Sequence, residues 1–82
     1  GDITAQSQDV LRQVDALLAR RGIDKSRVLS ATVTLADMAD YGDFNAVWDT
    51  WVVDGFEPAR AVTQGRLAVP EYRVKIALVA AL

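Results

Sequence analysis

The sequence contains neither cysteine nor histidine. Without cysteine, the chain can form no disulfide bond, iron–sulfur cluster or thiolate zinc site. Without histidine, it can form no Ser-His-Asp triad and no metal site that depends on imidazole ligands. A glycine-rich phosphate loop is absent as well. Residue spacing alone therefore assigns no reaction to this chain.

Basic residues and long apolar runs are also scarce. Nine Lys and Arg stand against eleven Asp and Glu, which gives a formal net charge of −2. A nucleic-acid-binding surface normally carries a clustered excess of basic residues, so this balance argues against such a partner. No apolar run approaches the ~18–20 residues that cross a bilayer, and no charged-then-apolar leader opens the sequence. We therefore expect a soluble, cytoplasmic protein with no nucleic-acid or membrane partner.

The length of 82 residues allows one domain, spanning 1–82, and hydrophobic periodicity divides it into helices and strands. Apolar residues at helical spacing predict helices over residues 4–21 and from residue 41 or 43 to residue 53. Period-two alternation predicts strands over residues 27–35, 60–67 and 73–81.

Capping signals mark the ends of both helices. Asp2 or Thr4 can cap the first helix, and Gly22 suits the left-handed position after its end. Asp43 is the expected cap of the second helix, which Gly55 should terminate. The first helix should bury one apolar stripe, made of Val10, Leu11, Val14, Leu17 and Leu18.

The order of elements predicts an α+β fold with two helices on one face of a small mixed sheet. Alternate residues of the first strand should face the helices, namely Leu29, Ala31, Val33 and Leu35. The last strand is apolar on both faces, so Ala77, Val79 and Ala81 need cover on the second face. Either an oligomer packs sheet against sheet, or further strands complete the sheet, because bare apolar edges favour aggregation. The remaining alternative is a very small monomer that tolerates the exposure.

Arg60 is the first candidate site residue, because it follows Pro58-Ala59 at the entry to a predicted strand. A guanidinium in that place can offer a planar, two-pronged donor to a carboxylate. The alternative is a surface arginine paired with Asp54 or Glu57, since exposed ion pairs are common and weak.

Lys75, Thr63 and Gln64 are further candidates in the predicted strands. Burial of Lys75 would lower its pKa and suit it to general-base or Schiff-base chemistry; alternatively, its stem packs inward while its ammonium reaches solvent. Thr63 and Gln64 can orient a small polar ligand or lie on a solvated face.

Two other groups of residues have structural explanations. Asp37, Asp40 and Asp43 are spaced by three, but they lack the Gly and the bidentate Glu of a calcium loop, so turn and capping roles are favoured. Trp48 and Trp51 can line a pocket, although core or interface packing is the commoner use of large aromatic side chains.

Four segments follow one another in an order and spacing typical of a known family: DKSRVLSATVTLADM at 24–38, DFNAVW at 43–48, PARA at 58–61 and VKIALVAA at 74–81. Together they resemble the Rid proteins, also called YjgF-type or L-PSP proteins. The resemblance implies a chorismate-mutase-like fold, a homotrimer with ligand sites in the clefts between subunits, and no cofactor or metal. It also implies hydrolysis of reactive enamine and imine intermediates to 2-oxo acids and ammonia, with Arg60 holding the substrate carboxylate.

The sequence departs from the family pattern at three places. Family chains open with a strand hairpin, whereas this sequence begins at the position that follows it, so we expect the domain to be N-terminally incomplete. Val62 stands where many members have a cysteine. Lys75 stands where active deaminases carry a glutamate, and a cation cannot accept a proton from water as a carboxylate does. Two functions stay open: a carboxylate-binding domain with or without hydrolysis, and a catalytically silent assembly module with vestigial clefts.

Overall fold

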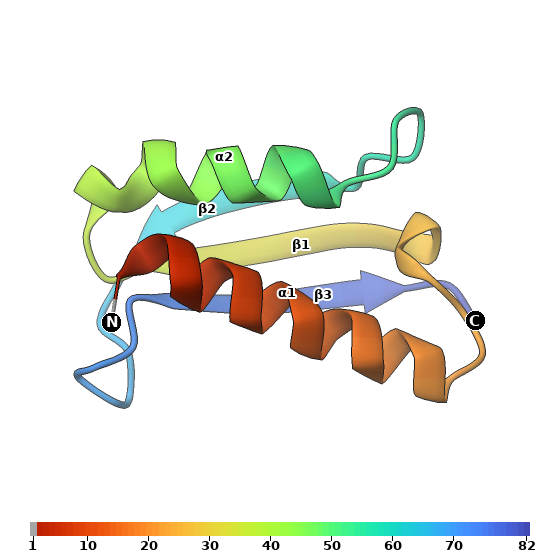
Figure 1. Ribbon diagram of the computed structural model, residues 1–82, viewed down its shortest axis with the longest axis horizontal. Helices are drawn as coiled ribbons and strands as arrows, with labels where there is room; N and C mark the ends of the chain where they lie inside the picture. The colour runs from red at the N-terminus through yellow and green to blue at the C-terminus, as the bar shows by residue number, and fades with distance from the viewer. Residues whose placement is uncertain (1) are drawn as a thin grey trace.

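The computed structural model describes residues 2–82, which form a three-stranded sheet covered on one face by two helices (Figure 1). This is the predicted order of elements and the predicted layering. The elements are α1 (Ile3–Arg20), β1 (Val28–Leu35), α2 (Tyr41–Trp51), β2 (Ala59–Gln64) and β3 (Val74–Ala80), with short 3-10 turns at Lys25–Arg27 and Met38–Asp40. Neither helix within residues 2–82 has the length and apolar character that a bilayer crossing requires.

Helix α1 begins and ends where its capping signals predict. The carboxylate of Asp2 accepts a hydrogen bond from the backbone N–H of Ala5 at 2.7 Å, which satisfies one of the unpaired donors of the first turn. Gly22 has a φ of +71°, and Ile23 N–H donates to the Leu18 carbonyl at 3.1 Å. This 6→1 hydrogen bond is that of a Schellman motif, which needs a residue such as glycine in the left-handed region.

Helix α2 begins at one of its two predicted starts, but its cap and its C-terminal end differ from the prediction. It begins at Tyr41 after Asp40, so Asp43 lies in the first turn and the prediction that Asp43 caps the helix is wrong. The helix ends at Trp51, and Gly55 lies in the turn beyond it with a φ of +85°. One face of α2 packs into the core, formed by Phe44, Val47, Trp48 and Trp51.

The sheet has the strand order β2-β1-β3, with β1 parallel to β2 and antiparallel to β3 (Figure 1). Residues directly opposite each other on neighbouring strands share a face. On the helix-covered face, Arg60, Ala31 and Leu78 therefore form one row. The next rows on that face are Val62, Val33 and Ile76, then Gln64, Leu35 and Val74.

Two predicted core positions are exposed instead. Leu29 is 58% exposed and Val28 only 3%, because a register shift between Val28 and Ser30 interrupts the alternation of β1. Leu17 is 56% exposed, because the buried residues of α1 are spaced by three or four and Leu18, not Leu17, falls in that series. That stripe comprises Ile3, Ser7, Leu11, Val14 and Leu18.

No helix or strand within residues 2–82 covers the opposite face of the sheet, as the sequence analysis predicted. We call it the open face; its exposed residues are Thr32, Ala59, Ala61, Thr63, Lys75, Ala77 and Val79. Val79 is 59% exposed although it is apolar. Ala81, the third position expected to need cover, is half-buried.

Candidate functional site

Arg60 lies on edge strand β2, on the face of the sheet that α2 covers. Its backbone is opposite Ala31 of β1, and its half-buried side chain reaches toward the helix. Three residues of α2 receive it: Tyr41, Asn45 and Trp48. Their i, i+4, i+7 spacing places all three on one face of the helix.

We call Arg60 and these three side chains the Arg60 cluster. Its contacts give the guanidinium a defined orientation. Nη1 donates to Asn45 Oδ1 at 2.6 Å, and Nη2 donates to the Tyr41 hydroxyl oxygen at 3.4 Å. The guanidinium carbon lies 5.4 Å from the ring centroid of Trp48 and 6.0 Å from that of Tyr41. Aromatic faces attract a cation at these separations, so two rings and one amide fix the orientation of the side chain.

No carboxylate neutralises Arg60 in the part of the chain that the structure describes. The two ion pairs between residues 2 and 82 are Arg12–Asp9 and Arg73–Asp40. The alternative of a surface ion pair with Asp54 or Glu57 is therefore wrong, and the Glu57 carboxylate instead accepts hydrogen bonds from Gly55 N–H. The guanidinium has no acidic partner within residues 2–82, and it has more N–H donors than its two contacts use.

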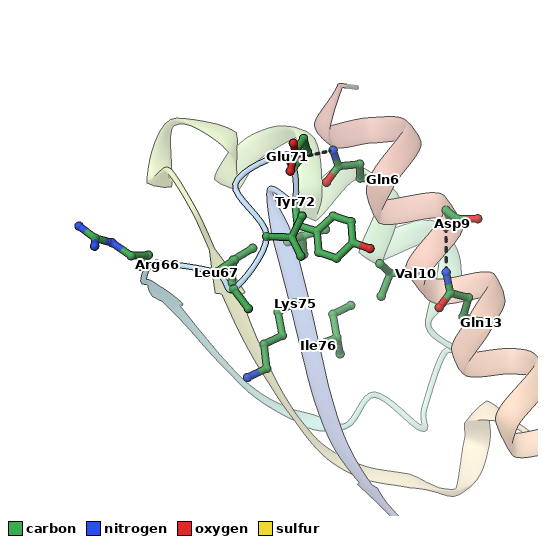
Figure 2. Close-up of a pocket in the computed structure, with 13 residues that line it drawn as sticks. Gln6, Asp9, Val10, Gln13, Arg66, Leu67, Glu71, Tyr72, Lys75 and Ile76 are labelled. Carbon is green, nitrogen blue, oxygen red and sulfur yellow. Dashed lines mark hydrogen bonds between the residues drawn. The ribbon is translucent and has the colours of Figure 1, made fainter.

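Thr63 and Lys75 do not lie beside Arg60. Both are opposite Thr34 of β1, which places them together in one row of the open face. Lys75 is exposed, so the interpretation of a buried lysine is wrong. Its side chain extends from β3 on the side away from α1 (Figure 2). A single chain therefore divides the predicted site residues between the two faces of the sheet.

The other polar candidates have structural partners. Gln64 Oε1 accepts a hydrogen bond from Met38 N–H at 2.8 Å and so connects β2 to the turn before α2. Asp37 caps that turn by accepting from Ala39 N–H at 2.9 Å. Within residues 2–82, no group of three acidic side chains is arranged to hold a metal ion.

Asp40 forms a bidentate ion pair with Arg73 that the sequence did not indicate. Its two carboxylate oxygens accept from Arg73 Nε at 2.9 Å and Arg73 Nη2 at 3.0 Å. These hydrogen bonds raise the pKa of Arg73 above its ordinary value. Asp40 is 7% exposed and immediately precedes Tyr41, so the pair anchors the start of α2 to the start of β3.

A cavity of about 590 Å³ lies at the other edge of the sheet, between α1, β3 and the loop before β3 (Figure 2). Apolar side chains such as Val10 and Ile76 line it, together with Tyr72 at the loop. Gln6 closes one end by donating to the Glu71 carbonyl at 3.0 Å and accepting from Arg73 N–H at 2.7 Å. The cavity follows the unpaired edge of β3 and includes no member of the Arg60 cluster.

Comparison with known proteins places this geometry in context. The family model described as Endoribonuclease L-PSP matches residues 1–82. A RutC family protein of Haemophilus ducreyi is 47% identical over 81 residues, which cover 99% of this chain and 69% of that protein. The 2-iminobutanoate/2-iminopropanoate deaminase of Mus musculus is 32% identical over 80 residues, which cover 98% of this chain and 58% of that protein.

Two crystal structures show the same arrangement of elements. A protein from Salmonella typhimurium superposes with a TM-score of 0.97 at 44% identity, covering 100% of this chain and 71% of the other. A member of the YjgF protein family from Neisseria meningitidis superposes with a TM-score of 0.93 at 51% identity, covering 98% of this chain and 68% of the other.

Proposed function

Since this chain belongs to the endoribonuclease L-PSP family, which includes YjgF-type proteins, we propose that it binds small carboxylate metabolites through Arg60 at clefts between copies of the chain. Family membership and the chorismate-mutase-like fold, both expected from the sequence, are confirmed. The ligand, the clefts and the role of Arg60 are our proposals.

The observation that carries the proposal is that no acidic side chain within residues 2–82 forms an ion pair with Arg60. The guanidinium is oriented by an amide, a phenol and an indole ring, none of which cancels its charge. A carboxylate is the planar anion that best matches the two-pronged donor of an arginine. Partial burial against α2 reduces solvent competition and so strengthens such a contact.

The open face supports assembly into an oligomer, and we propose a trimer. Ala59, Ala61, Ala77 and Val79 leave apolar side chains exposed in two of the three rows of this face, and the third row holds Thr63 and Lys75. Exposed apolar side chains that cluster on one face are typical of contacts between protein chains. In such an assembly the open face of one copy can meet the β2 edge of the next, which would bring Lys75 and Thr63 of a neighbouring copy toward Arg60.

Hydrolysis of an imine or enamine is the finer proposal, and the name of the mouse relative favours it. Water would add to the imine carbon and ammonia would leave, giving a 2-oxo acid, while Arg60 holds the carboxylate. Thr63 is a candidate for orienting the ligand, and Lys75 is a candidate catalytic residue at the position of the family glutamate. Both would have to act from a neighbouring copy, since they face away from Arg60 in their own chain.

A catalytically silent assembly module is the second candidate function. The residues that contact the Arg60 guanidinium offer an amide oxygen, a phenol and an indole, and none of these is a general base at neutral pH. Under this alternative the clefts are vestigial and bind no ligand.

Titration with 2-oxobutanoate, followed by NMR, tests carboxylate binding. We expect saturable shifts for residues of the Arg60 cluster, a loss of affinity of about tenfold or more in Arg60→Ala, and unchanged affinity in the control Arg66→Ala. Arg66 is an exposed arginine just after β2, and no hydrogen bond or ion pair described within residues 2–82 joins it to the cluster. Absence of binding, or equal affinity in wild type and Arg60→Ala, would favour the silent module.

Ammonia release from enzymatically generated 2-iminopropanoate tests hydrolysis separately. Release above the spontaneous rate that falls in Arg60→Ala would support the deaminase. Carboxylate binding without such release would leave a binding domain and remove hydrolysis from the proposal.

A further inference from the structure

Tyr41 places a solvent-accessible hydroxyl next to the Arg60 guanidinium. The residue is 38% exposed, and its oxygen lies 3.4 Å from Nη2 of Arg60. In this contact the guanidinium donates and the phenol oxygen accepts, because a guanidinium has no acceptor. The hydroxyl proton of Tyr41 must therefore point elsewhere, and the exposure of the side chain makes it accessible to a ligand.

The polar groups that the Arg60 cluster presents to a ligand are predominantly donors. Arg60 contributes its remaining N–H groups, and Tyr41 contributes its O–H. Asn45 uses its carbonyl oxygen to accept from Arg60 at 2.6 Å, so its amide N–H₂ is the group left to donate. Each acceptor atom that a ligand brings close to the guanidinium can form a hydrogen bond and so strengthens binding. An ammonium group would weaken binding, because it meets hydrogen-bond donors and a positive charge.

We propose that Tyr41 is a specificity-determining residue of this site, which rests on the proposed function of Arg60. Its hydroxyl donates a hydrogen bond to a second acceptor, an oxygen or imine nitrogen on the carbon next to the carboxylate that Arg60 holds. Adjacent donors in the cluster then match adjacent acceptors in the ligand. A plain carboxylate lacks the second acceptor, and an amino acid carries an ammonium in its place.

Neighbouring contacts hold the backbone at Tyr41, and its side chain contacts Arg60. Asp40, the preceding residue, is held by both hydrogen bonds from Arg73. The backbone N–H of Tyr41 donates to the Met38 carbonyl, which ties the residue to the 3-10 turn. The ring itself lies 6.0 Å from the guanidinium carbon. Because the backbone is held and Arg60 contacts both the ring and the hydroxyl, part of the conformational entropy of this side chain is lost before a ligand arrives.

The test compares dissociation constants for butanoate, 2-oxobutanoate and L-2-aminobutanoate, measured by NMR titration of the purified protein. These compounds have the same carbon chain and differ only in the substituent on the second carbon. Wild-type protein should bind 2-oxobutanoate about threefold to tenfold more tightly than butanoate, the range expected for one neutral hydrogen bond. L-2-aminobutanoate should bind most weakly.

Tyr41→Phe should bind 2-oxobutanoate and butanoate with about equal dissociation constants, so that the preference is lost. Tyr72→Phe should keep the wild-type preference. Tyr72 is the other tyrosine of the sequence; it is 58% exposed and lies at the cavity beside β3. A disturbance of Arg60 in Tyr41→Phe would weaken both ligands equally and would not change their ratio. The ratio therefore reports on the hydroxyl itself.

Failure of this proposal can be distinguished from failure of the proposed function. Arg60-dependent binding with no preference for 2-oxobutanoate, or with a preference that survives in Tyr41→Phe, would overturn the role of Tyr41 alone. Binding that does not depend on Arg60, or no binding of any of these compounds, would overturn both proposals.

Discussion

Asn45→Asp would place a negative charge where Arg60 now has a neutral partner. Aspartate has nearly the same shape as asparagine, and the oxygen concerned lies 2.6 Å from Nη1 of Arg60. Two unit charges about 4 Å apart attract by about 4 kcal/mol at an effective dielectric constant of about 20. Solvent access and lost side-chain freedom reduce the net value, so we expect an internal ion pair worth about 1–2 kcal/mol.

A ligand carboxylate would have to compete with that internal carboxylate for Arg60. The affinity of Asn45→Asp for 2-oxobutanoate should therefore fall about fivefold to thirtyfold at neutral pH, which corresponds to the same 1–2 kcal/mol. The assay is the NMR titration, with Asn45→Ala as the matched control. Asn45→Ala loses the same partner atom but keeps the positive charge of the site, so its affinity should fall less than that of Asn45→Asp.

The pH dependence separates this electrostatic effect from a change of shape. Arg60 should hold the pKa of the introduced carboxyl below its ordinary value of about 3.9, because the guanidinium favours the charged form. The variant should then recover affinity only as the pH falls below about 4, where that carboxyl becomes protonated. Equal affinities of Asn45→Asp and wild type at neutral pH would refute the reasoning, because they would mean that the charge of Arg60 does not hold the ligand.

Other consequences of the structure can be measured independently. Gly22→Ala should lower the free energy of unfolding by about 1 kcal/mol, because its φ of +71° is unfavourable for a residue with Cβ while no atom crowds that position; unchanged stability in urea denaturation would contradict the Schellman end of α1. Ser26→Ala should raise the pKa of Asp24 toward its ordinary value, because hydrogen bonds from Ser26 are the largest cause that lowers it. With the lowered pKa, Asp24 favours the folded state above the ordinary carboxyl pKa, and this contribution disappears as the pH falls through the lowered pKa; an unshifted Asp24 carboxyl titration by NMR in the variant would contradict the assignment. Val79→Glu should dissociate an oligomer packed through the open face while the domain stays folded, because this side chain is 59% exposed in the single chain. Light scattering after gel filtration checks this, and a wild-type monomer or an unchanged mass in the variant would contradict the assembly.

The sequence predicted the fold because its local signals agree with its layers. Asp2 and Gly22 marked the ends of α1, and periodicity separated both helices from the three strands. The prediction failed where tertiary structure overrides alternation. The irregular register between Val28 and Ser30 exposes Leu29. The residue types of β1 give no sign of this irregularity.

The site was harder to predict than the fold. Position in a strand and the family resemblance pointed to Arg60, but its partners come from α2, where the apolar pattern identifies only the buried residues. The helical spacing of residues 41, 45 and 48 indicates that they share one face of α2. The sequence alone did not show that Arg60 of β2 contacts this face, so Tyr41 and Asn45 could not be assigned to the site. The face occupied by Lys75 could not be assigned, because β3 is apolar on both sides; the pairing of Lys75 with Thr34 settles it.

The most direct measurement of the central proposal is a crystal structure of the protein soaked with 2-oxobutanoate. We predict that the ligand carboxylate lies within hydrogen-bond distance of the Arg60 guanidinium, about 2.7–3.2 Å from its nitrogens. Ligand density in the cavity beside β3 with none at Arg60, or no density at either place at saturating concentration, would contradict the account.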